Sequence, residues 1–285
     1  MILSVITINK NNASGLRKTI ESVINQTFED FEYIVIDGAS DDGSVEVIKE
    51  HSDRISFWVS ESDTGIYSAM NKGIRKANGE YVLMLNSGDY LCGRNVLEDI
   101  FPALNGVDIV QGNRIEKHDD GLWLNRGYGK SELSFLDVQR GHFLHQAAFC
   151  KHDLFEKYGY FDESYKYVSD TIFFIKTLGY GNSSFKYVDI DIVYFDMNGV
   201  SNTGDMTIRE KHAEEVSRMN RELFPGKLYE FCLESERKIM LYDELKSCGF
   251  LWKMTLMIKT LYERIYRKPN LVGIEKMDKD IMKKK

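Results

Sequence analysis

The sequence of 285 residues has little of what membrane proteins, secreted proteins and zinc proteins require. No apolar run reaches the roughly 18 to 20 residues of a membrane-spanning helix. No basic segment precedes the first apolar run, so we expect no signal peptide. The four cysteines lie far apart and form no CxxC pair, which argues against a zinc site and against structural disulfides. These absences favour a protein of the reducing cytoplasm.

Proline content and charge set further limits. The chain has only 3 prolines, so it contains no Pro-rich linker, and its 43% apolar and 28% charged residues are typical of a soluble globular protein. The formal net charge is -7, with an acidic excess over residues 1–204 and a basic excess over residues 205–285. The acidic part argues against a nucleic-acid partner.

Strand and helix patterns alternate in the first hundred residues. Buried-strand patterns cover Leu3–Ile8, Phe31–Ile36, Ile55–Val59 and Tyr81–Leu85, and helical spacing covers Ser14–Ile24, Ser44–His51 and Tyr67–Ala77. Strands that alternate with helices of this size predict an α/β fold with a parallel sheet and helices on its faces.

The pattern changes after residue 106. Strand patterns over Val107–Gly112, Gly121–Arg126 and Tyr187–Phe195 are mixed with helical ones over about Lys151–Tyr158 and Asp170–Leu178. From residue 205 onward the chain reads as helical, over Thr207–Leu223, Lys227–Ser247 and Leu251–Arg267. We therefore expect a domain over 1–204, divided into halves 1–105 and 106–204, and a helical extension over 205–285.

Polar clusters follow each of the first four predicted strands. They are Asn9–Asn11, the turn that begins at Asp37, the segment Ser60–Gly65, and Asn86–Asp89. Loops are often polar, but four such clusters on successive strands are harder to explain in that way. Because ligands of open α/β sheets bind at the carboxyl ends of the strands, we expect these clusters to line one crevice.

The clusters resemble, in their order, the inverting glycosyltransferases of family 2. The markers are Ser4–Asn9, Val35–Ser44, Ser60–Gly73 and Asn78–Asp89, and the resemblance covers about Leu3 to Asp196. It implies a GT-A fold, a mixed and mostly parallel sheet flanked by helices, with a nucleotide-binding half over 1–105 and an acceptor half over 106–204. The chain is most similar to the branch that builds bacterial exopolysaccharide, capsule and O-antigen.

The resemblance also implies the ligands. The donor would be a nucleoside-diphosphate sugar, with UDP as the expected carrier, and the acceptor a glycan or lipid-linked glycan. Nucleotide contacts are expected at eight positions: Thr7, Asn9, Asp37, Asp63, Met70, Lys72, Ser87 and Gly88. Within this set, Asp37 would accept a hydrogen bond from the base, since a carboxylate can accept from a ring N–H.

The metal motif of the family is Asp-X-Asp, and it is degenerate here. Only the last acid remains in Asn86–Asp89, so Asp89 is the expected ligand of Mg²⁺ or Mn²⁺. One protein carboxylate with phosphate oxygens and waters is a normal environment for Mg²⁺.

The acceptor half supplies the expected base. In the family, the acid corresponding to Asp170 removes the proton of the acceptor hydroxyl, which a single in-line displacement requires. Asp170 would also suit a helix N-cap, and the two roles are compatible. His145, Gln146 and Asp162 are expected on the acceptor side.

The tail has one apolar stripe at helical spacing, formed by Phe250, Met254, Met257, Ile258, Leu261 and Ile265. Basic residues dominate 246–268, where Glu263 is the one acid. Such a helix can lie on the surface of an anionic membrane. The protein would then be peripheral on the inner face of that membrane. A helix that packs on the catalytic domain, or at a homodimer interface, explains the stripe equally well.

Two other functions are compatible with parts of the sequence. A nucleotidyltransferase would need a Gly-rich phosphate loop with Arg or Lys directly after the first strand, which Asn9–Asn12 lacks. A non-catalytic relative that binds nucleotide or glycan is suggested by the degenerate metal motif. The presence of both Asp89 and Asp170 argues against it.

Overall fold

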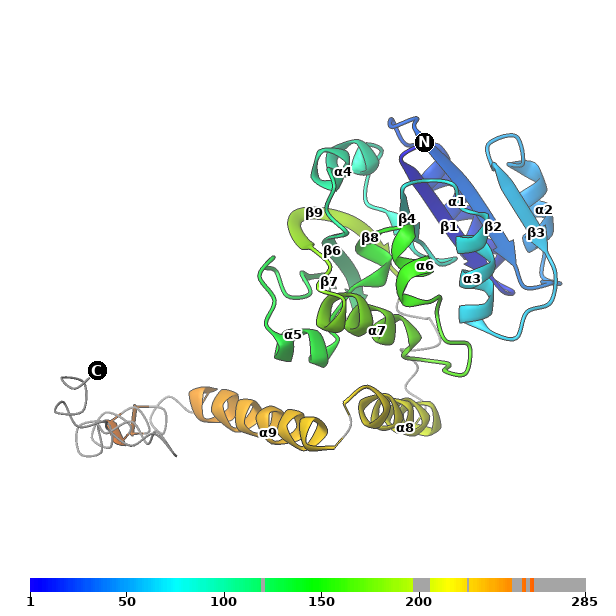
Figure 1. The fold of residues 1–285 in the computed structure, drawn as a ribbon. Helices are drawn as coiled ribbons and strands as arrows, with labels where there is room; N and C mark the ends of the chain where they lie inside the picture. Colours follow the sequence, from blue (N-terminus) through cyan, green and yellow to red (C-terminus); the bar gives the residue numbers. More distant parts are fainter. Residues whose placement is uncertain (119–120, 197–205, 225, 248–252, 255–256, 259–285) are drawn as a thin grey trace, which may run out of the picture. The chain divides into compact units, whose positions relative to one another are not determined.

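The computed structural model describes residues 1–118, 121–196, 206–224 and 226–247, together with 253–254 and 257–258 (Figure 1). The chain divides into two compact units, Met1–Pro225 and Gly226–Lys285. In the second unit, the described part is mainly the helix α9 (Lys227–Ser247). Each candidate catalytic, nucleotide-binding, metal-binding and acceptor-side residue lies in the first unit.

The first half of the sheet is parallel. It contains β1 (Leu3–Asn9), β2 (Phe31–Asp37), β3 (Phe57–Ser60) and β4 (Tyr81–Met84), which pair in the order β3-β2-β1-β4. The intervening helices are α1 (Ala13–Ile24), α2 (Ser44–Glu50) and α3 (Ile66–Lys76). This confirms the alternation predicted from the sequence.

The second half mixes strand directions. The sheet continues from β4 in the order β8-β6-β9-β5, through β8 (Ala148–Lys151), β6 (Ile109–His118), β9 (Phe185–Phe195) and β5 (Tyr90–Leu91), and β7 (Gly121–Asn125) pairs with β6. β8 runs antiparallel to both β4 and β6, whereas β6 and β9 are parallel. The result is the expected GT-A-like mixed sheet.

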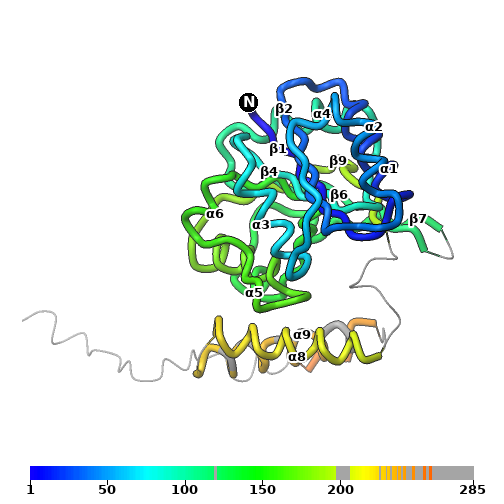
Figure 2. Tube along the Cα trace, turned by 90° about the vertical axis from the view of Figure 1, so that its right-hand side faces the viewer, coloured from blue at the N-terminus to red at the C-terminus, as the bar shows by residue number. Residues whose placement is uncertain are grey.

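Helices cover both faces of this sheet. Figure 2 shows α1 and α2 on one side of β1, and α3 with α6 (Asp153–Tyr158) on the other. The remaining helices of the second half are α4 (Val96–Leu104), α5 (Phe135–Arg140), the short η1 (His145–Ala147), and α7 (Ser169–Phe174), which continues into the π-helical turn η2 (Ile175–Tyr180).

β1 is the centre of the hydrophobic core. All seven of its residues are buried, because neighbouring strands flank it on both edges and helices cover both faces. α3 approaches β1 closely at Gly73, where a Cβ atom would lie 2.4 Å from Cγ2 of Ile6. The core therefore fixes α3, and with it the loop that precedes it, against the end of β1.

The helix α8 (Met206–Leu223) belongs to the first compact unit, although the sequence analysis assigned it to the extension. Glu215 accepts the backbone N–H groups of Lys166 and Tyr167, both at 2.8 Å. Phe224, just after α8, is buried against the ring of Phe135. Tertiary contacts of this kind carry the first unit past residue 204.

The expected amphipathic helix over 251–267 lies almost entirely outside the described residues, as do Phe250, Leu261 and Ile265 of its stripe. Of the helices that the structure describes, none combines the length and the apolar character of a membrane span.

Candidate active site

A cleft of about 1440 Å³ opens at the carboxyl ends of β1 and β4. Its walls come from the end of β1, the start of α1, the loop before α3, the turn after β4, the β6–β7 hairpin and the end of β9. The cleft therefore lies at the strand ends of the parallel half, and residues of three of the four predicted polar clusters line it, whereas the turn that begins at Asp37 does not.

The turn after β4 is held beside β1 by backbone pairing that continues past the strand. Leu85 N–H donates to Ile6 O at 2.8 Å, and Ser87 N–H donates to Ile8 O at 3.0 Å. Thr19 of α1 fixes the turn from the other side, because its hydroxyl donates to Asp89 O at 2.6 Å and accepts Gly88 N–H at 3.0 Å. These bonds orient the turn toward the cleft.

Gly88 is required by this geometry. Its φ of +104° lies in the left-handed region, and a Cβ atom there would lie 2.7 Å from Oδ2 of Asp196. The close approach shows that the Asp196 carboxylate lies over the turn. Ser87 and Gly88, both predicted to contact the nucleotide, line the cleft.

Asn9 and Asp63 also line the cleft, and Asp37 lies directly behind Asn9. Each carboxylate oxygen of the fully buried Asp37 accepts two hydrogen bonds, from Asn9, Ser40 and Ser60. Burial alone would raise the pKa of Asp37, but the hydrogen bonds from Ser40 and Ser60 hold it below its ordinary value. In this conformation Asp37 positions Asn9 and the turn after β2, and a contact with the base stays a prediction.

Besides Asp37, three predicted nucleotide residues lie outside the cleft wall. Thr7 is buried and accepts the hydroxyl of Tyr33 at 3.0 Å. Met70 is buried in α3. The Nζ atom of Lys72 forms an ion pair with Glu61 at 2.9 Å and donates to Ser62 O at 3.1 Å, which ties α3 to the preceding loop.

Asp89, the predicted metal ligand, lies behind the turn and is only 3% exposed. Its Oδ1 atom accepts the backbone N–H of Asp196 at 2.8 Å, and Oδ2 is buried without a hydrogen-bond partner in the described part of the chain. Burial raises the pKa of Asp89 to about 7, although the N–H of Asp196 and the nearby His145 and Arg114 act in the opposite direction.

An unpartnered buried carboxylate oxygen is the feature expected of a ligand to a missing cation. The described residues contain no group of three or more His, Cys, Asp or Glu side chains that could hold a metal by themselves. The residues present therefore fit a divalent ion that takes most of its ligands from the diphosphate and from water.

Asp170, the predicted base, lies in the first turn of α7, and its side chain is 16% exposed. Tyr67 of α3 donates its hydroxyl to Oδ1 at 2.9 Å, and Nδ1 of His145 lies 2.7 Å from Oδ2. Burial opposes the charge, but the hydrogen bonds from His145 and Tyr67 and the positive charge of an imidazolium hold the pKa of Asp170 below its ordinary value. The position that caps α7 is Val168, so Asp170 is not its N-cap.

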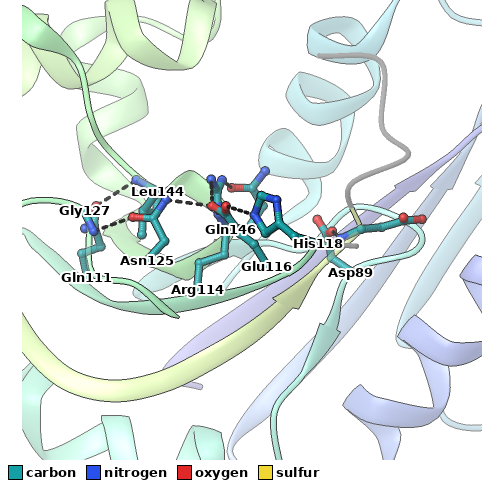
Figure 3. A network of polar contacts seen from close by, with 10 residues as sticks. Asp89, Gln111, Arg114, Glu116, His118, Asn125, Gly127, Leu144 and Gln146 are labelled. Atoms are coloured by element: carbon teal, nitrogen blue, oxygen red, sulfur yellow. Dashed lines mark hydrogen bonds and ion pairs between the residues drawn. The ribbon is translucent and has the colours of Figure 1, made fainter. Parts of the chain in front are cut away.

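Gln146 joins a polar network around Arg114 (Figure 3). The guanidinium donates to Gln146 at 3.2 Å and pairs with Glu116 at 2.5 Å, and it covers the ring of Phe195 at 4.2 Å. His118 lies 3.2 Å from the same carboxylate. The network orders the β6–β7 hairpin beside Asp89. Asp162 lies apart from it, exposed, and accepts Ser164 N–H at 2.9 Å.

Lysine side chains line the cleft, and of these only Lys10 belongs to a polar cluster that the sequence placed there. Lys10, Lys18 and Lys117 come from three separate places on the wall, and His118 follows Lys117. Such a set of cations raises the local concentration of anions such as a diphosphate. The position of Lys18 in the cleft could have been predicted from the sequence, because Lys18 follows Ser14 by one helical turn and both therefore lie on the same face of α1.

This mixed sheet, with a cation-lined cleft at its strand ends and a buried carboxylate at the turn after β4, defines a GT-A glycosyltransferase. The chain belongs to glycosyl transferase family 2, whose model matches residues 4–159. The protein is therefore a glycosyltransferase enzyme, as the sequence motifs predicted.

Proteins of similar sequence are also named glycosyltransferases. An uncharacterised glycosyltransferase of Mycobacterium tuberculosis is 34% identical over 189 residues, which are 61% of this chain and 68% of the relative. A PGL/p-HBAD biosynthesis glycosyltransferase of Mycobacterium bovis is 26% identical over 209 residues, 71% of this chain and 80% of the relative.

Solved structures show the same fold at low identity. The Staphylococcus aureus TarS 1-349 structure in complex with UDP-GlcNAc has a TM-score of 0.62 and 19% identity, over 78% of this chain and 67% of that one. The chain spans 42% of the longer TarS structure. The mannosyltransferase PcManGT of Pyrobaculum calidifontis, solved with GDP-Man and Mn²⁺, has a TM-score of 0.55 and 16% identity, over 91% of this chain and 80% of that one.

Proposed function

We propose that the protein is an inverting glycosyltransferase that moves a sugar from a nucleoside diphosphate, with UDP as the expected carrier, to a hydroxyl of a glycan or lipid-linked glycan. The observation that carries the proposal is the cleft at the ends of β1 and β4, which combines cations with polar side chains.

Binding of the sugar nucleotide, the first part of the proposal, rests on two kinds of side chain in the cleft wall: amide oxygens that can accept hydrogen bonds, and lysines. The Oδ1 atoms of Asn9 and Asn86 are buried without partners within the described residues, and both residues line the cleft. They are free to accept N–H or O–H groups of a base or ribose. Lys10, Lys18 and Lys117 supply positive charge for the diphosphate.

The acceptor half rests on Asp170. Inversion is one displacement, in which the acceptor oxygen forms a bond to the anomeric carbon as the bond to the diphosphate oxygen breaks. The acceptor proton must leave in the same step, and Asp170 is the proposed recipient. Its low pKa keeps it in the carboxylate form that can accept a proton at neutral pH.

A divalent ion held at Asp89 would supply positive charge to the departing diphosphate. The chain's own contribution is to fix Asp89 through the Asp196 N–H and through the turn that Thr19 holds. These bonds fix the backbone of the turn before the donor arrives.

The place of the reaction is proposed from the relatives. The M. bovis relative is named for PGL/p-HBAD biosynthesis, and this is consistent with a role in building a surface glycan or glycolipid. An acceptor linked to lipid would suit a protein that is peripheral on the inner face of a membrane, with residues 246–268 as the proposed contact.

The proposal is tested by a screen of nucleoside-diphosphate sugars for thermal stabilisation in the presence of Mn²⁺. A donor at 100 times its Kd stabilises the folded state by about 2.7 kcal/mol, which a melting curve resolves readily. The stabilising sugar nucleotide should then be hydrolysed slowly to nucleoside diphosphate and sugar. Formation of a sugar nucleotide and pyrophosphate from a nucleoside triphosphate and a sugar 1-phosphate, without hydrolysis of the sugar nucleotide, would indicate a nucleotidyltransferase and contradict the proposal.

A further inference from the structure

The strands β7, β6, β9 and β5 present one face to solvent beside the cleft. They pair in that order, with β7 at the outer margin of the first unit (Figure 2). Side chains of paired residues point to the same face, and successive residues of a strand alternate between the two faces. The register therefore places five apolar side chains together, which we call the apolar face: Tyr90, Ile115, Leu122, Leu124 and Tyr194.

Solvent reaches all five of these side chains. Leu122 is 62% exposed, Leu124 is 41% exposed and Tyr90 is 37% exposed, whereas Ile115 and Tyr194 are partly buried. The rings of Tyr90 and Tyr194 stack with their centroids 5.0 Å apart, which orders the aromatic end of the face. Single exposed apolar side chains are normal, but a contiguous group of them marks a binding surface.

The packing of the domain does not require an apolar face here. On the opposite face of the same strands, Leu91 and Val193 are buried in the core, and Arg114 and Glu116 form part of the polar network. A sheet with one face in the core and the other in water normally carries polar side chains on the solvated face. Apolar side chains in that position therefore indicate a ligand that covers them.

The apolar face is continuous with the cleft. Tyr90, Leu122 and Tyr194 also line the cleft wall, as does Lys117, which pairs with Leu122. A molecule that lies on the face therefore reaches the cleft without leaving the protein surface. The amide side chains proposed to bind the base or ribose come from β1 and from the turn after β4, so the apolar face is left for the acceptor.

The side chains of the face select the chemistry of the ligand. A sugar ring carries hydroxyls that need hydrogen-bond partners, and the side chains of Ile115, Leu122 and Leu124 offer none, whereas an alkyl chain needs none. The sequence has Asp119 and Asp120 between β6 and β7, and two acids beside the face argue against an anionic membrane as its ligand.

We propose that the apolar face binds the lipid part of a lipid-linked acceptor while the sugar of that acceptor lies in the cleft. The stacked tyrosines, which belong to both the face and the cleft wall, would lie at the junction of sugar and lipid, because a tyrosine combines an apolar ring with a hydroxyl. The inference rests on the proposed function, since it selects one of the two acceptor classes named there.

The test measures the affinity of alkyl glucosides for the parent protein by saturation-transfer-difference NMR. The probes are methyl, hexyl and octyl β-D-glucopyranoside below the micelle concentration of the octyl compound, with UDP and Mn²⁺ present to occupy the donor site. Each buried CH₂ should raise the affinity by up to about fourfold, so the octyl compound should bind at least about 10-fold more tightly than the methyl compound. Equal affinity of these two compounds overturns the inference, whatever the variants show.

Leu124→Gln tests whether the chain binds at this face. Leu124 lies on the face but outside the cleft wall, and its exposure makes a glutamine there compatible with the fold. The variant should bind octyl glucoside about 5-fold more weakly than the parent. Leu241→Gln is the matched control, because it changes a leucine of α9 that is 56% exposed, and it should leave the affinity unchanged. Equal affinity of Leu124→Gln and the parent overturns the inference.

Two other ligands of the face would give different results. If a second copy of the chain covers it, Leu124→Gln will lower the dimer mass in analytical ultracentrifugation. If a membrane covers it, Leu124→Gln will abolish binding to vesicles of phosphatidylcholine and phosphatidylglycerol. Either result overturns the inference. Because glucoside binding requires no sugar transfer, a failure of the proposed function would appear separately, as tight binding of octyl glucoside by a protein that hydrolyses no sugar nucleotide.

Discussion

Replacement of Asp89 by Asn should make the metal-free protein more stable at alkaline pH while it removes activity. The buried carboxyl of Asp89 has a pKa raised from 3.8 to about 7. The folded state therefore holds this proton more tightly than the unfolded state does, and the free energy of unfolding falls as the pH rises between these two values. Asn has the same size and can still accept the N–H of Asp196.

The magnitude follows from the shift. Three pKa units correspond to about 4 kcal/mol of destabilisation when Asp89 is fully ionised and no cation is present. About 2.5 kcal/mol of this should appear between about pH 5 and pH 8, where the folded-state carboxyl titrates. Subtracting the free energy of unfolding of Asp89→Asn from that of the parent at each pH removes the contribution of the other groups that titrate in this range.

The assay is urea denaturation of both proteins in EDTA at the two pH values. The parent should lose stability relative to Asp89→Asn as the pH rises, and Mn²⁺ with UDP should restore the parent alone. Identical pH dependence of the two proteins would show that Asp89 is not a buried, uncompensated carboxylate, and the reasoning would fail.

Three further predictions concern other parts of the site. Asp170→Asn should lower turnover by roughly 10²- to 10⁴-fold with UDP affinity retained in calorimetry, and an unchanged turnover would move the base to another residue. Gly88→Ala should destabilise the fold by about 1–3 kcal/mol in urea denaturation, because it combines a positive φ with a clash at Asp196, and a neutral effect would contradict the described turn. Deletion of residues 246–285 should release the protein from anionic vesicles in a sedimentation assay, whereas loss of a dimer mass with vesicle binding intact would show that this segment packs between subunits.

The parallel half of the fold could be predicted because the patterns that specify its strands and helices lie within short segments of the sequence. Each of β1, β2 and β4 is a short apolar run bounded by turn residues, and each helix between them has an apolar face at helical spacing. The position of the cleft could also be predicted, because the carboxyl ends of parallel strands lie at one edge of the sheet. β5 was not predicted, because a strand of two residues leaves no periodicity to detect, and β8 was not predicted either.

The sequence predicted which residues belong to the candidate site, but it did not predict which of them contact one another. The pairing of Asp170 with His145 joins segments that no spacing in the sequence relates, and it depends on how η1 packs against α7. The contact of Asp37 with the base stays a prediction, and only the folded turn reveals that Ser40 and Ser60 donate hydrogen bonds to its carboxylate. The extent of the first unit likewise depends on Glu215 of α8, which accepts backbone N–H groups from a distant loop.

The most direct test of inverting transfer from a nucleoside-diphosphate sugar is the stereochemistry of donor hydrolysis. The protein is incubated with Mn²⁺ and an α-linked UDP-sugar that stabilises it, and the first-formed sugar is followed by proton NMR with Asp89→Asn as the inactive control. The account predicts release of UDP with the β-anomer formed first. Formation of the α-anomer first, or equal release by the Asp89→Asn variant, would contradict it.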